Sequence, residues 1–382
     1  MKVEVESVES FRERARAFIR ENLRPAKQRS VSSSLRADKT DEQELAQVAH
    51  ERKLQRMLFD AGLAGVCVPL QYGGQGLTPA HQRALNAELR GYEYPSRLQV
   101  PTFTPCLSVL LEFGTEEQKL KHVPAILKGE ELWMQFLSEP SCGSDVAGAL
   151  TTAVRQGDEW VLNGSKVWTT GAWWSDWGLC LARTNWDTTK HSGLTVFMFP
   201  IKIEGMEVNR IEMLNGSKEF CQEYLTDVRI PDSYRVGGVD AGWTVGTRWM
   251  FHERMARNSP FVTAPDGEVR AGGTGATMHA IARAAGKLDD PRAQELVGEA
   301  QTLNLVGDAL RRRVGQGIVT RTLSDQSSAI ARLFIGLAEA RRATIAFELA
   351  GSAGAVWAPD DGDLGEWGID FLMRQAVCIG GG

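Results

Sequence analysis

The stretch Ser138-Glu139-Pro140-Ser141-Cys142-Gly143-Ser144-Asp145 decides how this chain is interpreted, together with a second stretch that follows soon after it. The second stretch is Asn163-Gly164-Ser165-Lys166-Val167-Trp168-Thr169-Thr170-Gly171. Both stretches lie between strand-like runs, so we expect two β-edges that clamp a flat ring system. The first edge offers main-chain and hydroxyl groups, and the second adds an indole face and two more hydroxyls. This pattern indicates a flavin.

The residues around the two edges read as a β-domain over 131–236. Short apolar runs alternate there with turn clusters such as Gln156-Gly157-Asp158 and His191-Ser192-Gly193, a pattern typical of antiparallel strands. We therefore expect an antiparallel β-barrel domain. Its predicted strands are residues 133–137, 160–162, 178–182, 194–199 and 220–229.

Helical patterns flank this domain on both sides. Residues 1–130 form a predicted N-terminal helical domain, with apolar residues at three- and four-residue spacing in 11–23 and 44–60. Residues 237–382 form a predicted C-terminal helical domain, with helices over 243–257, 276–318 (broken near Asp289-Asp290-Pro291) and 325–350. In the last of these we expect Ile330, Leu333, Phe334 and Leu337 to form a buried stripe. The helical–β–helical order predicts an α+β fold and argues against a doubly wound sheet.

Composition excludes several classes of protein. The 382 residues are 43% hydrophobic and 24% charged, which is ordinary for a globular protein large enough for two or three packed units. The formal net charge of −5 leaves no basic footprint for nucleic acid. The N-terminus has no apolar signal core and no run of eighteen apolar residues occurs, so we expect a cytoplasmic protein with no membrane partner.

Other cofactor signatures are missing from the sequence. The six cysteines are scattered, so we expect free, mostly buried thiols. No HExxH motif occurs and the histidines lie far apart, so we expect no metal site. Neither a GxxxxGK[ST] loop nor a GxGxxG after a strand is present, so a nucleotide cofactor must be held in another way.

Taken together, these features resemble the acyl-CoA dehydrogenase family over essentially the whole chain. The form of the first edge and Phe251-His252-Glu253-Arg254 look most like the actinobacterial FadE-like branch, which often handles bulky acyl chains. The resemblance implies FAD as cofactor and an acyl-CoA as substrate, which is desaturated to a trans-2-enoyl-CoA. Three further stretches carry the resemblance: Val68-Pro69-Leu70-Gln71-Tyr72-Gly73-Gly74-Gln75-Gly76, Phe113-Gly114-Thr115-Glu116-Glu117-Gln118-Lys119 and Leu372-Met373-Arg374.

The first edge supplies four of the implied binding residues. Leu137 and Ser138 would lie against the isoalloxazine ring and hydrogen-bond its polar edge. Gly143 and Ser144 would meet the pantetheine arm of the substrate and the cofactor, since glycine permits close backbone approach. The alternative interpretation is a Pro/Gly turn that only joins two strands.

The second edge supplies Trp168, Thr169 and Thr170. The resemblance implies that Trp168 stacks beside the flavin and shields one face, and that Thr170 bonds near the ring or the ribityl chain. The alternative is that Trp168 is a strand residue that packs in the β-core, because aromatic residues are favoured in strands in any case.

The chemistry requires one strong base. Desaturation removes a proton next to the thioester and a hydride from the following carbon to flavin N5. A carboxylate in a dry pocket suits this because burial raises its pKa towards the working pH. The family's C-terminal position for the base matches Cys378-Ile379-Gly380-Gly381-Gly382, where glycine stands instead. A second family position, on a helix directly before an arginine, matches Glu253-Arg254.

The resemblance therefore implies Glu253 as the base and Arg254 near the CoA moiety. The alternative is that Glu253 is a solvated or ion-paired helix residue, as glutamates usually are.

Two departures from the family concern the contacts between subunits. In the family a neighbouring subunit completes the FAD site with an arginine and with a glutamine before a glycine-rich turn. The first matches Arg283-Ala284-Ala285-Gly286, displaced by one position, and the second matches Glu348-Leu349-Ala350-Gly351, with glutamate for glutamine. Gly351 would lie at the cofactor, but a carboxylate near phosphates repels them unless it is paired. A heteromer with a related subunit, with FAD in half of the sites, would resolve this.

We therefore expect an FAD-dependent acyl-CoA dehydrogenase, a homo- or heterotetramer, that passes electrons to an electron-transfer flavoprotein. One alternative is a flavin oxidase or monooxygenase on the same scaffold. The other is a catalytically silent partner subunit of a heteromeric dehydrogenase, which the glycines at the C-terminal position favour and Glu253-Arg254 opposes.

Overall fold

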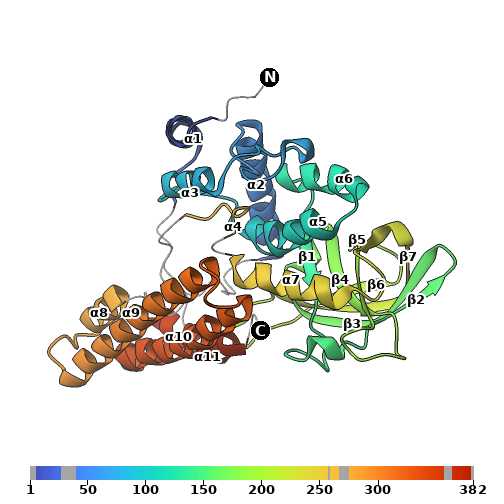
Figure 1. Cartoon of the computed structure of the whole chain (residues 1–382). Coiled ribbons are helices and arrows are strands. Elements are labelled where there is room, and N and C mark those ends of the chain that lie inside the picture. Colours follow the sequence, from blue (N-terminus) through green and yellow to red (C-terminus); the bar gives the residue numbers. More distant parts are fainter. Residues whose placement is uncertain (1–5, 27–39, 257–258, 266–274, 357–363, 380–382) are drawn as a thin grey trace. The chain divides into compact units, whose positions relative to one another are not determined.

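The computed structural model describes residues 6–26, 40–256, 259–265, 275–356 and 364–379. The chain divides into two compact units (Figure 1). The first unit comprises residues 1–26, 39–212 and 218–266, and the second comprises 27–38, 213–217 and 267–382. The three-domain division expected from the sequence stays a prediction.

The first unit begins with helices whose starts are encoded locally. Thr40 and Gln43 form a capping box at the start of α2, and Thr115 and Gln118 form another at the start of α6. Pro79 opens α3, where its missing N–H costs nothing. The helices of this part are α1 (Val8–Asn22), α2 (Asp41–Asp60), α3 (Pro79–Glu88), α4 (Ser96–Leu98), α5 (Leu107–Phe113) and α6 (Glu116–Leu127).

Among the described residues, the helices α1 to α6 are followed by an eight-stranded sheet. Its strands are hydrogen-bonded in the order β6-β7-β3-β2-β4-β5-β8, and β1 pairs with β4 beside this path. Bulky side chains such as Trp133, Phe136, Phe197 and Phe199 are fully buried against it. The strands are β1 (Trp133–Phe136), β2 (Thr152–Gln156), β3 (Glu159–Thr170), β4 (Trp177–Arg183), β5 (Leu194–Pro200), β6 (Met206–Arg210), β7 (Phe220–Pro231) and β8 (Arg235–Val236).

The expected antiparallel barrel is wrong in two respects. First, the sheet is mixed, because β1 runs parallel to β4 and β2 meets β4 in a parallel pair. Second, the pairings among the described strands end at β6 and β8 and do not close into a barrel. Parallel partners far apart in sequence leave no mark in a local alternation pattern, so only tertiary pairing reveals them.

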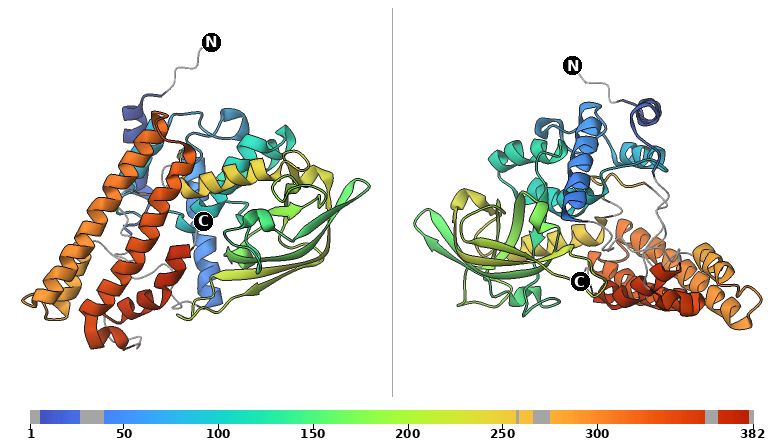
Figure 2. Two further views of the ribbon diagram at one scale, coloured as in Figure 1. Left: turned by 60° about the horizontal axis from the view of Figure 1, so that its bottom comes forward. Right: turned by 180° about the vertical axis from the view of Figure 1, so that it is seen from behind.

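Helix α7 (Gly242–Arg254) completes the first unit and runs beside the sheet in all views (Figures 1 and 2). It contacts the irregular segment η2 (Gln99–Cys106), where the Thr104 hydroxyl donates to the His252 carbonyl at 3.1 Å. The end of α7 is thereby anchored to the N-terminal part of the unit.

The second unit is a helical bundle. Its helices are α8 (Gly275–Ala284), α9 (Pro291–Val319), α10 (Ser328–Ala350) and α11 (Gly365–Ile379). The break predicted near Asp289-Asp290-Pro291 is confirmed, because α8 ends before it and Asp290 caps α9 with Pro291 as its first residue. Helix α11 was not predicted from the sequence. The bundle's core includes Met278, Leu296, Ile345, Leu349 and Trp367.

The buried stripe predicted on α10 is wrong for three of its four residues. Ile330, Leu333 and Leu337 are 54%, 68% and 60% exposed in the chain. Phe334 is partly buried and faces Gly307 of α9. The side of α10 that packs in the bundle consists mainly of small residues, which let the helices approach closely. Apolar spacing thus identified an apolar face but not its partner.

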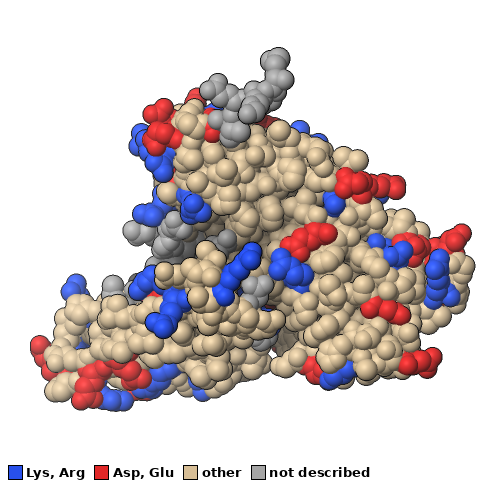
Figure 3. Space-filling model, viewed as in Figure 1, with Lys and Arg blue, Asp and Glu red and all other residues tan. Residues whose placement is uncertain are grey.

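The surface charges are mixed, and the cysteines form no disulfides. Acidic and basic side chains are interspersed on the face shown in Figure 3. All six cysteines are free and four are buried, as predicted. Within the described ranges, no helix combines the length and apolar character needed to cross a membrane.

Candidate functional site

The two predicted edges are direct neighbours in the structure. The Val167 N–H donates to the Ser138 carbonyl at 3.0 Å, so the chain after β1 continues alongside β3. The Lys166 ammonium donates to the Leu137 carbonyl at 3.1 Å. Leu137 is buried and Ser138 is partly exposed. The structure therefore places Leu137 and Ser138 beside the residues that lead into Trp168.

A buried ion pair fixes this arrangement. Lys166 Nζ lies 2.8 Å from Glu139 Oε1, and the ammonium also donates to the Leu181 carbonyl at 2.7 Å. The Glu139 carboxylate accepts from the Leu150 and Thr151 amides at 2.6 and 3.0 Å. Burial opposes ionisation of Glu139, but Lys166 and these amides outweigh it and hold its pKa below the usual value. This contact between Glu139 of the first edge and Lys166 of the second was not predicted from the sequence.

The rest of the first edge is an exposed loop tied down at one end. Gly143 and Ser144 are exposed, and a Cβ added at Gly143 would meet nothing within 4 Å. Beyond them, Lys190 Nζ pairs with Asp145 at 2.8 Å, and Arg183 donates to the Ala147 carbonyl at 2.5 Å. The backbone at Gly143 and the Ser144 hydroxyl are therefore exposed to solvent, while the contacts of Asp145 and Ala147 hold the end of the loop.

Trp168 occupies a β-bulge in β3. Val167 pairs with Gln222 and Thr169 pairs with Cys221, so Trp168 is the extra residue between two β7 partners. Its φ of 68° is rare for an aromatic residue, and its side chain is 54% exposed. The interpretation of Trp168 as a β-core residue is therefore wrong. Exposed aromatic side chains on strained backbone concentrate at functional sites.

After the bulge, Thr169 is buried and Thr170 is partly exposed. The Thr169 side chain is 3% exposed, and its hydroxyl donates to Glu223 Oε2 at 2.9 Å. A cofactor would therefore meet the main chain of Thr169 and not its hydroxyl. Thr170 is partly exposed and precedes Gly171, whose φ is 72° and where a Cβ would overlap the Trp174 ring. Only glycine suits that turn.

Helix α7 connects Glu253 to the same edge. The Trp249 indole N–H donates to Gln135 Oε1 at 2.6 Å, and Gln135 lies two residues before Leu137. Glu253 follows Trp249 by one helical turn, about 6 Å along the axis. It is half-buried, and its charge adds to burial in raising the pKa of the Cys106 thiol. The predicted base and the predicted ring edge thus share β1 as a support.

The neighbours of Glu253 on α7 are firmly held. Arg248 forms a two-pronged ion pair with Glu112 at 2.9 and 2.8 Å, and His252 Nε2 lies 2.7 Å from the same carboxylate. Burial lowers the pKa of His252, and Glu112 opposes this shift. The Nε atom of Arg254 is buried and has no hydrogen-bond partner among the described residues. Arg254 therefore retains a donor for a polar ligand.

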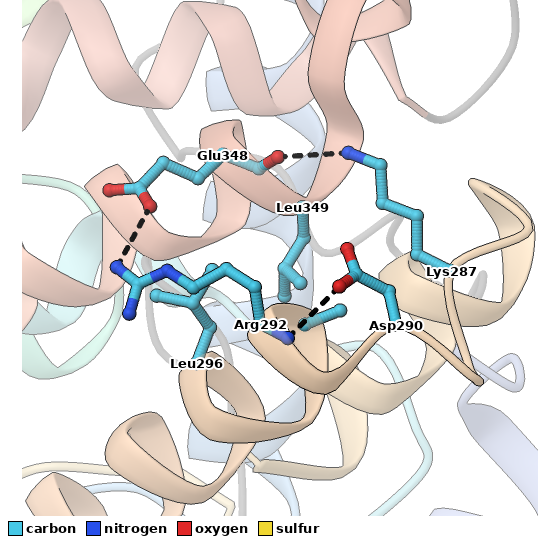
Figure 4. Close-up of a pocket in the computed structure, with 7 residues that line it drawn as sticks. Lys287, Asp290, Arg292, Leu296, Glu348 and Leu349 are labelled. Atoms are coloured by element: carbon cyan, nitrogen blue, oxygen red, sulfur yellow. Dashed lines mark hydrogen bonds and ion pairs between the residues drawn. The ribbon is translucent and has the colours of Figure 1, made fainter.

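Glu348 lies in the second unit, where it lines a cavity of about 330 Å³ (Figure 4), and Gly351 follows it three residues later in the chain. Lys287 Nζ donates to the Glu348 carbonyl at 3.1 Å and lies 2.9 Å from where a Gly351 Cβ would be. The Glu348 carboxylate pairs with Arg292 at 3.7 Å and with Arg341 at 3.4 Å. Its charge is therefore compensated, so the glutamate does not by itself forbid a phosphate nearby.

The residues of the first unit fit a flavin. A large indole stands exposed on a bulge, and main-chain groups and hydroxyls of the adjoining edge lie next to it. Gly380-Gly381-Gly382, the glycines at the C-terminal base position, lie outside the described residues. The roles expected for Glu253, Arg254, Leu137, Ser138 and the other site residues stay predictions.

Two family models match the chain. The model described as acyl-CoA dehydrogenase, N-terminal domain, matches residues 6–130, and acyl-CoA dehydrogenase, middle domain, matches 135–228. Acyl-CoA dehydrogenase FadE29 of Mycobacterium tuberculosis is 30% identical over 342 residues, or 87% of this chain and 84% of FadE29. FadE34 of the same organism is 34% identical over 272 residues, or 70% of this chain. The matched region is only 36% of FadE34.

One solved structure extends this likeness to the whole chain. The structure described as the Tcur3481-Tcur3483 steroid ACAD has a TM-score of 0.75 and 25% sequence identity. The alignment covers 100% of this chain and 95% of that one.

Proposed function

Because this chain belongs to the acyl-CoA dehydrogenase family, we propose that it catalyses the FAD-dependent α,β-dehydrogenation of an acyl-CoA thioester to a trans-2-enoyl-CoA. The observation that carries the proposal is that the helix of the proposed base and the proposed ring edge are both attached to β1. Trp249 holds α7 to Gln135 of β1, and the chain after β1 pairs with β3 through Ser138 and Val167. A rigid scaffold of this kind suits a reaction whose groups must be placed accurately.

Each element of the site has a proposed task. Leu137, Ser138, Trp168 and Thr170 bind and orient the isoalloxazine ring, and Thr169 contributes its main chain. Gly143 and Ser144 meet the pantetheine arm of the substrate and the cofactor, and Arg254 meets the CoA moiety. Bound FAD supplies the hydride acceptor for the reaction. The exposure of Trp168 and of the Gly143-Ser144 loop, and the buried free donor of Arg254, support these tasks.

Glu253 is the proposed base, and its Oε atom takes the proton from the carbon next to the thioester. Its half-buried position supports this task, because partial exclusion of water raises the proton affinity of a carboxylate. Its place after Trp249 also supports the task, because the Trp249–Gln135 hydrogen bond fixes the distance of this helical turn from the ring edge.

We further propose that the enzyme works as an oligomer and passes its electrons to an electron-transfer flavoprotein. The apolar face of α10 formed by Ile330, Leu333 and Leu337 supports a subunit contact, because single chains rarely leave such faces uncovered. Gly351 would then lie at a cofactor shared between subunits. The structure described with two partners, Tcur3481-Tcur3483, and as a steroid ACAD supports a related second subunit and a bulky, sterol-like acyl group.

The second candidate function is a silent partner subunit that supports a catalytic relative. The features in its favour are the glycines at the C-terminal base position and the departures at Arg283 and Glu348 from the family's subunit contacts. In this case the chain would bind little flavin of its own.

The test is to purify the full chain, count flavin per chain from visible absorption, and add acyl-CoA substrates anaerobically. About one flavin per chain, bleached by an acyl-CoA, is the expected result. Colourless protein that becomes coloured only with a related subunit would support the silent partner. Bound flavin that no acyl-CoA bleaches would contradict the proposed activity, and oxygen consumption during turnover would identify an oxidase.

A further inference from the structure

The Glu112 carboxylate of α5 binds two side chains from one turn of α7. Its oxygens accept the Arg248 Nε–H and Nη2–H at 2.9 and 2.8 Å, and His252 Nε2 lies 2.7 Å from its Oε1. The hydrogen bonds from Arg248 and His252 hold the pKa of Glu112 below its usual value, so the group is ionised near neutral pH. An ionised carboxylate only accepts hydrogen bonds, so His252 carries a proton on Nε2. Three N–H donors of α7 therefore converge on one side chain of α5.

The spacing along α7 places these donors beside the side of the helix that carries Glu253. Arg248 and His252 are four residues apart and lie one above the other on the same side. Trp249 and Glu253 are also four residues apart and share the adjacent side, about 100° further round the helix. Trp249 is fully buried there and donates to Gln135 of β1 at 2.6 Å. The side of Glu253 therefore faces β1.

The segment η2 confirms the direction in which this turn faces. The His252 carbonyl is one of the last four of α7, which have no partner inside the helix, and the Thr104 hydroxyl of η2 donates to it at 3.1 Å. Burial, and after it the charge of Glu253, raises the pKa of the Cys106 thiol at the end of η2. The turn before Glu253 is thus held from η2, from β1 and from α5.

The contact with Glu112 restricts the rotation of α7. Trp249 anchors the turn on one side, and Glu112 anchors the adjacent side through two residues in successive turns. Two anchors on different sides of a helix restrict its rolling more than either anchor does alone. Rolling of α7 would turn the Glu253 side chain away from β1, so the contacts of Glu112 oppose this movement.

We propose that Glu112 is a positioning residue, which acts through Arg248 and His252 to set the direction in which α7 presents Glu253 to the substrate. The inference rests on the proposed function in naming Glu253 as the base. Transfer of the proton from the carbon next to the thioester requires the Glu253 carboxylate to lie close to that proton. A displacement of about 1 Å can slow a step of this kind about 10²-fold.

Positioning by Glu112 can be separated from a contribution to folding. The Arg248 and Glu112 side chains are 37% and 32% exposed, and ion pairs at such positions contribute little to stability. Replacing Glu112 by Gln keeps the shape of the side chain and removes its charge. The variant should therefore fold and bind FAD as the wild type does, while α7 loses one of its anchors.

The first experiment measures amide hydrogen exchange in the full chain by mass spectrometry. Peptides that cover 242–254 should exchange faster in Glu112→Gln than in the wild type, because this turn is held less firmly. The matched control is Glu88→Gln. Glu88 of α3 accepts two hydrogen bonds from Arg16 of α1 at 2.9 Å, so this variant breaks the same kind of two-pronged pair. Exchange of α7 should be unchanged in the control, and equal exchange in Glu112→Gln and the wild type would overturn the proposal.

The second experiment follows the bleaching of the flavin in the FAD-loaded proteins after rapid anaerobic mixing with octanoyl-CoA. A steroid-chain acyl-CoA replaces it if octanoyl-CoA leaves the wild type unbleached. In Glu112→Gln the rate constant at saturating substrate should fall about 10- to 100-fold, while the amplitude per flavin stays that of the wild type. Deuterium on the carbon next to the thioester should slow the bleaching of this variant, because proton transfer limits it. Glu88→Gln should match the wild type in rate constant and amplitude.

Rate constant and amplitude distinguish positioning from a loss of folded protein. A lower amplitude at the wild-type rate constant would show that part of the variant is inactive, and it would contradict the proposal. A wild-type rate constant in a variant with faster exchange would show that Glu112 holds α7 but does not position Glu253, and this also overturns the proposal. If no acyl-CoA bleaches the wild type, the proposed function fails, while hydrogen exchange still decides whether Glu112 holds α7.

Discussion

The Lys166 ammonium lies 2.8 Å from Glu139 Oε1, and the two side chains are 0% and 3% exposed. This buried pair joins β3 to the loop after β1, so both edges of the proposed cofactor site are fixed to each other. Such a pair need not stabilise the fold more than apolar residues would, but breaking one partner leaves a buried, uncompensated charge. The site geometry therefore depends on both residues being present.

Replacing Lys166 by Met should lower the free energy of unfolding by about 3–5 kcal/mol, because Glu139 is left buried without its counter-charge. Urea unfolding followed by circular dichroism measures the loss. The matched control is Lys190→Met, which breaks an exposed pair with Asp145 and should change the free energy of unfolding far less. Equal losses in the two variants would contradict the structural role of Lys166.

The same ion pair predicts acid sensitivity. The pKa of Glu139 is lower in the folded chain than its ordinary value, so the stability it contributes is present above that ordinary value. This stability is lost as the pH falls through the folded-state pKa. Melting temperatures measured from pH 7 downwards should fall less steeply in Glu139→Gln than in the wild type. Parallel curves would show that Glu139 does not carry this effect.

Replacing Trp168 by Ala should weaken FAD binding about 10-fold, because a stacking partner for the ring is lost. Stability should change little, since the side chain is 54% exposed. Titration calorimetry with FAD measures the change. Trp186→Ala removes a similarly exposed indole from the segment after β4 and should leave FAD binding unchanged. Equal losses of FAD affinity in the two variants would show that Trp168 does not stack on the cofactor.

Replacing Glu253 by Gln should reduce acyl-CoA turnover about 10²- to 10⁴-fold, the usual contribution of a general base. Flavin content should remain that of the wild type, because Glu253 is not part of the proposed ring edge. Glu117→Gln, on the exposed side of α6, is the control and should keep full turnover. A Glu253→Gln protein with normal turnover would rule out this residue as the base.

Replacing Leu333 by Glu should disrupt assembly, because a charge would enter the apolar face of α10 when that face is covered. Sedimentation velocity should show a smaller species than the wild type, with unchanged helix content. Leu120→Glu alters a leucine of α6 that is 56% exposed and should leave the assembly intact. An unchanged assembly in Leu333→Glu would place the subunit contact on another surface.

Local patterns were sufficient for much of the fold. The break before Pro291 follows from the chemistry of helix ends, and the strands β1, β3, β4, β5 and β7 follow from apolar runs between turns. The strands β2, β6 and β8 were not predicted. The mixed sheet did not follow, because β1 and β4 are parallel partners separated by two other strands in sequence. The exposed face of α10 did not follow either, since a spacing pattern shows which residues are apolar and not what covers them.

Residue types at fixed spacing were enough to indicate the family, to select the two edges and to propose Glu253 as the base. The contacts that hold these parts in place appear only in the folded chain. The contacts of Lys166 with Glu139, of Trp249 with Gln135 and of Thr169 with Glu223 all join residues distant in sequence. Burial makes these contacts matter, because polar groups removed from water must find partners within the protein. Burial is a property of the folded chain and cannot be read from any local stretch of it.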